Sequence, residues 1–307
     1  MKRWLPFFWL LVPLAGLVEM GHHAWVEARI PTDEDWEQAA DVIDAGWQEG
    51  DLVVITPWWA SQGWQELGRF MTVEQMARED DTGYGTIWEV ALPGHRHEQY
   101  AATGTLLDEK RAGRLTVRRY RFPDAPTNIY DFVAALETDA SVTMVSQAGG
   151  ENEPCQFRAH PKAGLVPNAA VQTGKFACDP RLPWNSVARE VIADLTNRPR
   201  LCIWAHPVSQ KRISITFEGV PEGAVIEGHT GLEYEAARET IDRPPIFLEI
   251  RTAGKVVGTH ALDRHSGWTP YRFDLGPAGT GGTITFEVFS HDVDMGHFCF
   301  TAKLRDR

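Results

Sequence analysis

The second half of the sequence constrains the fold most strongly, because it consists of short alternating segments separated by glycine and proline turns. Apolar residues at every second position are typical of strands that bury one face. Residues 252–254, Thr-Ala-Gly, lie between two such runs and predict a hairpin turn. Many short strands at this spacing indicate a β-sandwich of jelly-roll type. The candidate strands are 141–146, 213–219, 246–252, 255–262, 271–275, 283–290 and 298–304.

The first half alternates between helical and strand patterns. Thr32 and Asp35 have the spacing of a capping box, and the apolar residues that follow recur at helical intervals. Together with two short apolar runs, this pattern predicts a small three-layer α/β domain with a short parallel sheet. The expected elements are strands 52–55 and 86–92, a polar helix over 95–110, an edge strand 115–120 and, within the second half, a helix 186–197.

The predicted organisation is therefore α/β plus all-β. We expect an α/β domain at residues 25–123 and a β-sandwich domain at 128–307. The stretch "FPDAPTN" at 122–128 contains two prolines and reads as the linker.

The N-terminus predicts export. Lys2 and Arg3 precede an apolar run over residues 4–18, which is shorter than the roughly 20 residues of a comfortable membrane span. The length suits a signal peptide, but no small-x-small cleavage site follows, so residues 1–20 are either a signal peptide or an uncleaved signal anchor. Either form places the rest outside the cytoplasm, in the periplasm or at the cell surface. With an anchor, the N-terminal segment would hold the protein in the inner membrane.

If the protein is exported, its four cysteines are expected to form structural disulfides. Their number is even, and in an oxidising compartment four cysteines form two disulfides in one of three pairings. None has the spacing of a zinc or redox site. The favoured pairing is Cys155–Cys178, which closes a local loop, with Cys202–Cys299.

Charge and missing motifs exclude several classes of function. The net charge of −12 argues against a nucleic-acid partner, which would require a basic face. The sequence has no phosphate-binding glycine loop, no nucleophile elbow and no zinc-protease helix. No cofactor is expected, apart from the calcium alternative below.

Three tryptophans follow the expected strand 52–55 in "PWWASQGWQ". Ligands of open α/β sheets bind at the carboxyl ends of strands, and indole rings can stack on the C–H faces of sugars. This loop is a candidate ligand-binding surface, and the alternative is packing beneath the loop or against the sandwich domain. We expect at least one indole to be exposed and the others to be buried. The candidate residues are Trp58, Trp59, Trp64, Gln62 and Arg69.

A second candidate, "PGHRHEQY", follows the strand 86–92. His95 and His97 could bind a metal, with Glu98 as a third ligand, and Arg96 could contact a ligand. The alternative is a solvated polar loop.

Two further loops lie in the second half. Asp292 and Asp294 in "HDVDMGHF" could bind calcium through hard oxygen ligands, or form a plain polar hairpin. The stretch "LDRHSGWTPYRFDLG" combines aromatic rings with polar groups, which fits a sugar-binding face or an ordinary sandwich loop equally well; the candidate residues are Asp263, His265, Trp268, Tyr271 and Arg272.

Several stretches resemble one family. "GDLVVITPWWASQGWQELG" and "YGTIWEVALPG", with "GVPEGAVIEGHTGL", "SGWTPYRFDLG" and "HFCFTAKLR", are similar to extracytoplasmic tails of large bacterial membrane glycosyltransferases of the protein-mannosyltransferase type. The resemblance covers nearly all of residues 25–307 and implies an envelope location and an association with glycans. The chain departs from that family because it has no polytopic membrane region, so sugar transfer is not implied.

These observations favour a non-enzymatic, membrane-anchored extracytoplasmic protein that binds an envelope glycan or an envelope protein in a glycan-handling assembly. One alternative is a glycan-directed hydrolase or transferase with its site at the strand ends of the α/β domain. Another is a structural component of a surface layer or filament.

Overall fold

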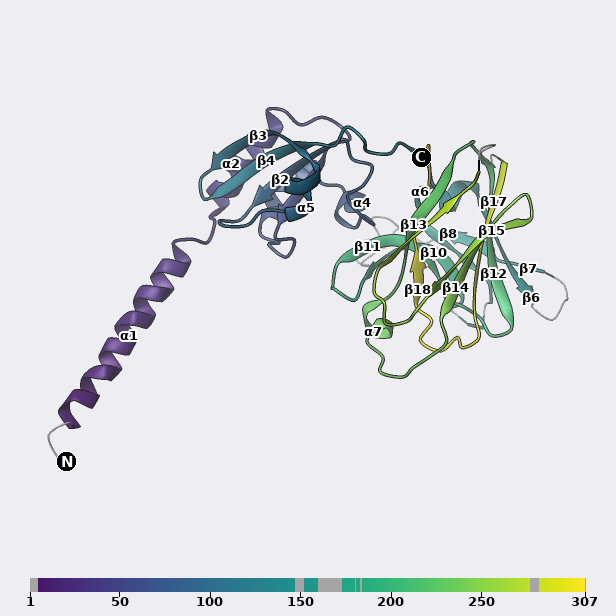
Figure 1. Cartoon of the computed structure of the whole chain (residues 1–307). Helices are drawn as coiled ribbons and strands as arrows, with labels where there is room; N and C mark the ends of the chain where they lie inside the picture. The colour runs from purple at the N-terminus through teal and green to yellow at the C-terminus, as the bar shows by residue number, and fades with distance from the viewer. Residues whose placement is uncertain are drawn as a thin grey trace. The chain divides into compact units, whose positions relative to one another are not determined.

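The computed structural model of the protein describes residues 5–146, 152–159, 173–179, 181–182, 184–276 and 282–306, with side chains from residue 11 onward. The expected leader's Lys2 and Arg3 lie outside the described residues. The chain forms two compact units, Met1–Thr72 with Tyr84–Asp124 and Val73–Gly83 with Ala125–Arg307 (Figure 1). Residues 73–83, which the sequence analysis assigns to the first domain, thus belong to the second unit.

The first unit contains a four-stranded sheet in the order β1-β2-β4-β3. Only β1 (Leu52–Thr56) and β2 (Thr86–Ala91) run parallel, so the expected parallel sheet is reduced to one pair within a mixed sheet. Helix α2 (Asp33–Asp44) has the predicted Thr32 capping box, and its apolar face is buried. The remaining elements are α1 (Leu5–Glu27), α3 (Gly63–Leu67), η1 (Gly68–Phe70), α5 (Glu98–Thr103), β3 (Thr105–Ala112) and β4 (Leu115–Arg121).

The edge of this sheet differs from the prediction. Strand β4 lies inside the sheet between β2 and β3, because it buries Leu115 and Val117 on one face and pairs Arg118 with Glu89. The strand at this edge is the largely exposed β3. The expected polar helix 95–110 is partly present, because α5 covers residues 98–103 while β3 takes residues 105–110. Within the described part of the chain, no helix combines the length and apolarity that crossing a membrane requires.

The second unit is a two-sheet β-sandwich, as predicted (Figure 1). One sheet has the order β5-β19-β13-β18-β11-β10-β9-β8, with β16 also paired to β13, and the other has the order β15-β14-β17-β12-β6-β7. Alternate residues of both sheets fill one apolar core, which also takes in Phe132 and Leu136 of α6.

The strands of the first sheet are β5 (Asn128–Asp131), β8 (Gln156–Ala159), β9 (Gly174–Ala177), β10 (Ser186–Ala193), β11 (Pro199–Ala205), β13 (Val225–Leu232), β16 (Thr269–Asp274), β18 (Phe298–Phe300) and β19 (Lys303–Arg305). Those of the second are β6 (Ala140–Ser146), β7 (Glu153–Pro154), β12 (Lys211–Val220), β14 (Ile246–Thr252), β15 (Lys255–Leu262) and β17 (Gly282–Ser290). The helices are α4 (Val73–Met76), α6 (Phe132–Asp139) and α7 (Tyr234–Ala237).

The expected helix 186–197 is wrong, because its residues form strand β10 between β9 and β11. Its apolar residues suit either a helix or a strand buried on both faces, and strand pairing decides between them. The expected strand 298–304 is divided into β18 and β19. Helix α6, which the sequence analysis does not identify, is capped by the Asp131 carboxylate.

Two disulfides join Cys155 to Cys178 and Cys202 to Cys299, the pairing favoured from the sequence. The second bond connects neighbouring strands β11 and β18.

Candidate functional site

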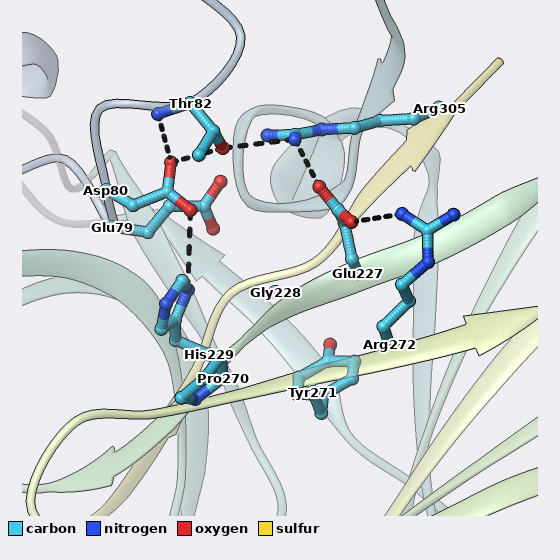
Figure 2. A pocket seen from close by; sticks show the side chains of 10 residues that line it. All are labelled: Glu79, Asp80, Thr82, Glu227, Gly228, His229, Pro270, Tyr271, Arg272 and Arg305. Atoms are coloured by element: carbon cyan, nitrogen blue, oxygen red, sulfur yellow. Dashed lines mark hydrogen bonds and ion pairs between the residues drawn. The ribbon is translucent and has the colours of Figure 1, made fainter. Parts of the chain in front are cut away.

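The second unit contains a pocket of about 400 Å³ on the sheet that includes β13 and β16. We call residues 73–83 the strap, and its residues Glu79, Asp80 and Thr82 form one side of the pocket. Figure 2 shows Glu79 and Asp80 facing His229 and Glu227 of β13. The lining residues are Glu79, Asp80, Thr82, Glu227, Gly228, His229, Pro270, Tyr271, Arg272 and Arg305. The lining side chains therefore include both hydrogen-bond donors and acceptors.

Strand pairing fixes the floor of the pocket. Strands β13 and β16 are antiparallel, and Glu227 lies opposite Arg272 in their register. Gly228 allows a close approach of the backbone, because a Cβ atom there would lie 2.0 Å from the Thr301 carbonyl oxygen. Only glycine fits this position without a shift of the backbone.

Backbone contacts hold the strap on the sandwich. The Leu201 amide donates to the Ala77 carbonyl at 2.6 Å, and the Arg200 guanidinium donates to the Arg78 and Glu79 carbonyls at 2.9 and 2.8 Å. Lys303 forms an ion pair with Glu79 Oε1 at 2.6 Å. These bonds place the strap's side chains at the pocket even though the strap is not part of either sheet.

Glu227 organises the positive side of the pocket. Its carboxylate pairs with Arg272 at 2.9 Å and also with the fully buried Arg305. The Arg305 guanidinium in turn donates to the Thr82 hydroxyl at 3.0 Å. The half-exposed Arg272 thus holds a fixed guanidinium at the edge of the pocket.

Two buried polar atoms of the pocket have no hydrogen-bond partner in the described residues: Glu79 Oε2 and His229 Nδ1. The Glu79 side chain is only 3% exposed. His229 Nδ1 lies 3.9 Å from Asp80 Oδ2, which is beyond a hydrogen bond. Burial lowers the pKa of His229 and favours the neutral imidazole. Most buried polar atoms in native proteins are paired, so these two atoms are exceptions in the lining of the pocket.

Trp268 and His265 differ in their relation to this pocket. The half-buried Trp268 indole stacks parallel to the His229 imidazole, with ring centroids 5.9 Å apart, and its Nε1 donates to the Glu79 carbonyl. Trp268 therefore positions His229 and the strap. His265 is exposed on its loop and is not among the lining residues.

All three indoles of the predicted aromatic loop are exposed in the first unit. The exposed fractions of Trp58, Trp59 and Trp64 are 37%, 60% and 38%. The expectation that some would be buried is therefore wrong. Gln62 and Arg69 are exposed as well.

The second predicted loop lies beside the first, because β1 and β2 are parallel neighbours and the Leu92 amide donates to the Thr56 carbonyl. His95 and Arg96 are exposed, and Arg96 donates to the Tyr120 hydroxyl at 3.2 Å. The His97 ring stacks on Tyr100 with centroids 3.7 Å apart.

The predicted calcium turn is occupied by arginine. Arg243 pairs with Asp292 and Asp294, each at 2.9 Å. The buried Arg264 guanidinium donates to the backbone carbonyls of the same two residues. These side chains supply the positive charge that the sequence analysis assigned to an ion.

Among the residues that the structure describes, no group of three or more His, Cys, Asp or Glu side chains is placed to hold a metal ion. Neither the His95/His97 pair nor the Asp292/Asp294 pair belongs to such a group.

Sequence reasoning missed most of the pocket. Its acidic residues come from the run "REDDT" at 78–82, in the half of the chain assigned to the α/β domain. The only local signal was that run beside a short helix, while the partners on β13 and β16 lie far along the chain.

No family model and no curated protein matches this chain. Similar solved structures include the CBM51-2 and INT domains of Clostridium perfringens ZmpB (12% identity, 38% of this chain and 25% of that chain, TM-score 0.30). The CBM51 of C. perfringens GH95 in complex with methyl-galactose has 15% identity over 38% of this chain and 79% of that chain, with a TM-score of 0.28. Tandem CBM51 modules of a family 98 glycoside hydrolase from Streptococcus pneumoniae have 12% identity over 54% and 48%, with a TM-score of 0.30.

These neighbours contain carbohydrate-binding modules, but at such low identity and TM-score they carry no argument about this chain's ligand. The resemblance to glycosyltransferase tails stays a prediction.

Proposed function

We propose that this protein is a non-enzymatic extracytoplasmic glycan-binding protein whose sandwich unit takes a sugar residue into the pocket beside the strap. The observation that carries the proposal is the pair of buried atoms without partners, Glu79 Oε2 and His229 Nδ1. A sugar offers several hydroxyl groups, each of which can donate and accept a hydrogen bond.

The charges around the pocket fit a neutral ligand. Glu79 is already paired with Lys303, and Glu227 is paired with Arg272 and Arg305. The charges of these side chains are therefore already balanced within the protein, and a charged ligand would find no free partner among them. A hydroxyl can donate to Glu79 Oε2 or to the Asp80 carboxylate without displacing these pairs. A hydrogen bond to a charged acceptor contributes about 1.5–3 kcal/mol, and several together give a specific site.

The location outside the cytoplasm is supported by the two disulfides, which persist in oxidising compartments. In this proposal, residues 1–20 act as the export leader or as an anchor at the membrane. Mass spectrometry of the mature N-terminus tests this part, and an intact N-terminus in the cytoplasmic fraction would contradict it.

The binding proposal is tested with a glycan array of bacterial envelope glycans, followed by calorimetric titration of the glycans that bind. Asp80→Asn removes one carboxylate oxygen while an amide oxygen can still accept from Thr82, and it should weaken binding about 10-fold or more. Glu218→Gln, an exposed position on β12, is the matched control and should bind normally. The proposal is wrong if no glycan on the array binds, or if Asp80→Asn and His229→Asn both bind as tightly as the native protein.

A further inference from the structure

A second cluster of interest lies on the first unit, in the loop from Trp58 to Trp64, which we call the indole loop. Its three indoles lie within seven positions of the sequence and are all exposed, Trp59 most of all at 60%. Exposed large aromatic side chains in such density mark sites of contact with another molecule.

The indole loop has a defined conformation. Ala60 and Gly63 are buried beneath it, and a Cβ atom on Gly63 would lie 2.4 Å from the Trp36 ring. The Ala60 amide donates to the Pro57 carbonyl, and the Trp64 amide donates to the Ser61 carbonyl, both at 3.0 Å. The loop backbone therefore packs against buried Trp36, and this packing holds the loop in the conformation that leaves its three indoles exposed.

Polar side chains are interleaved with the rings. Ser61, Gln62 and Gln65 are exposed between or beside the indoles. A continuous apolar patch, as in the core of a protein–protein interface, is therefore interrupted at this loop. A sugar chain has the matching alternation, because its rings have apolar C–H faces and hydroxyl edges.

The neighbouring loop adds donors at the same edge of the sheet. Thr56 and Ala91 are partners in the parallel pair β1–β2, so the chain segments that follow both strands begin side by side. Arg96 in the second segment is exposed, and so is Arg69 close behind the indole loop. Guanidinium groups can donate to sugar hydroxyls or stack on indoles.

We infer that the indole loop is a second glycan-contacting surface, which stacks sugar rings on Trp58, Trp59 and Trp64 while Gln62, Arg69 and Arg96 hydrogen-bond to their hydroxyls. The inference rests on the proposed function in taking a glycan as the ligand. It adds to the pocket of the second unit a separate contact surface on the first unit.

The test uses the full chain and the glycan that binds on the array. This glycan is supplied as two probes, a short fragment and the intact polymer. In the triple variant Trp58→Ala, Trp59→Ala and Trp64→Ala, affinity for the polymer should fall by about 10-fold or more, because the stacking contacts of three indoles with the sugar rings are lost. Affinity for the fragment should not change. Trp184→Ala, which removes a 43% exposed indole elsewhere, is the matched control and should leave polymer binding intact.

Protection of the indoles provides an independent readout. Polymer binding should reduce acrylamide quenching of tryptophan fluorescence in the native protein, and the reduction should be smaller in the triple variant. Near-ultraviolet circular dichroism of the remaining tryptophans verifies that the variant is folded.

The outcomes separate the two proposals. If Asp80→Asn abolishes fragment binding and the triple variant binds polymer normally, the pocket stands and the indole-loop inference is overturned. If the triple variant loses polymer while Asp80→Asn and His229→Asn bind both probes normally, the indole loop stands and the pocket proposal fails. Absence of binding to any glycan, or capture of an envelope protein through the indoles instead, overturns the inference.

Discussion

The ion pair between Glu79 and Lys303 gives the sharpest prediction about stability. The Glu79 side chain is 3% exposed, the Lys303 side chain is 15% exposed, and the two charged atoms are 2.6 Å apart. Removing one partner of a buried pair leaves an uncompensated charge, which costs about 3–5 kcal/mol, whereas replacing both is often close to neutral.

We therefore expect Glu79→Gln and Lys303→Met each to lower the free energy of unfolding by about 3–5 kcal/mol. The double variant should lose no more than either single variant, which gives a coupling energy of about 3 kcal/mol or more. Urea unfolding followed by circular dichroism measures all three, because the midpoint shifts with stability while the slope stays constant.

A surface pair in the same unit is the matched control. Lys211 and Glu153 are 2.8 Å apart with side chains 30% and 55% exposed, so their coupling should be below about 1 kcal/mol. If the Glu79–Lys303 coupling is as small as that of the control pair, the strap is not held by a desolvated ion pair and the reasoning is refuted.

Three other predictions concern the same unit. The disulfide between Cys202 and Cys299 spans 97 positions, so replacing both residues by alanine should cost about 4–5 kcal/mol by loop entropy, and a loss below about 1 kcal/mol in chemical unfolding would contradict this. Burial lowers the pKa of His206 in the folded protein, so its contribution to stability is fully present above about pH 6.5 and decreases as the pH falls below that value. His206→Gln should reduce the fall in melting temperature between pH 7 and 5, and an unchanged acid slope would be evidence against this account. Gly228→Ala should lower the melting temperature by many degrees, because its Cβ atom would overlap the Thr301 carbonyl, and a variant that melts normally would show that the backbone yields there.

The sandwich could be predicted from the sequence where local signals agree. Residues 246–262 alternate on both sides of a Thr-Ala-Gly turn, and β14 and β15 have the predicted bounds. The structure also confirms the favoured one of the three possible cysteine pairings. In contrast, "SVAREVIADLTN" has a helical periodicity that pairing with β9 and β11 overrides.

The site was less accessible to sequence reasoning. Its residues are ordinary charged groups whose meaning depends on non-local neighbours, such as Glu79 against Lys303 and Asp80 against His229. In the turn with Asp292 and Asp294, by contrast, the local sequence suggested a site, because two nearby carboxylates suit calcium. Only the structure shows that Arg243 forms ion pairs with both of them. The indole loop was predicted in part. Its position after β1 followed from the sequence, but the exposure of all three indoles did not.

The strap determines how this protein can be divided and how it is made. A segment starting at residue 125 would lack Glu79 and Asp80, and Lys303 would lose its carboxylate partner. The hydrogen bond from Arg305 to the Thr82 hydroxyl joins residues 223 positions apart. During synthesis it can therefore form only after strand β19 has been translated, and the second unit is complete only then. Exchange of either half of the chain as one contiguous piece would separate Glu79 and Asp80 from the strands that form the rest of the pocket.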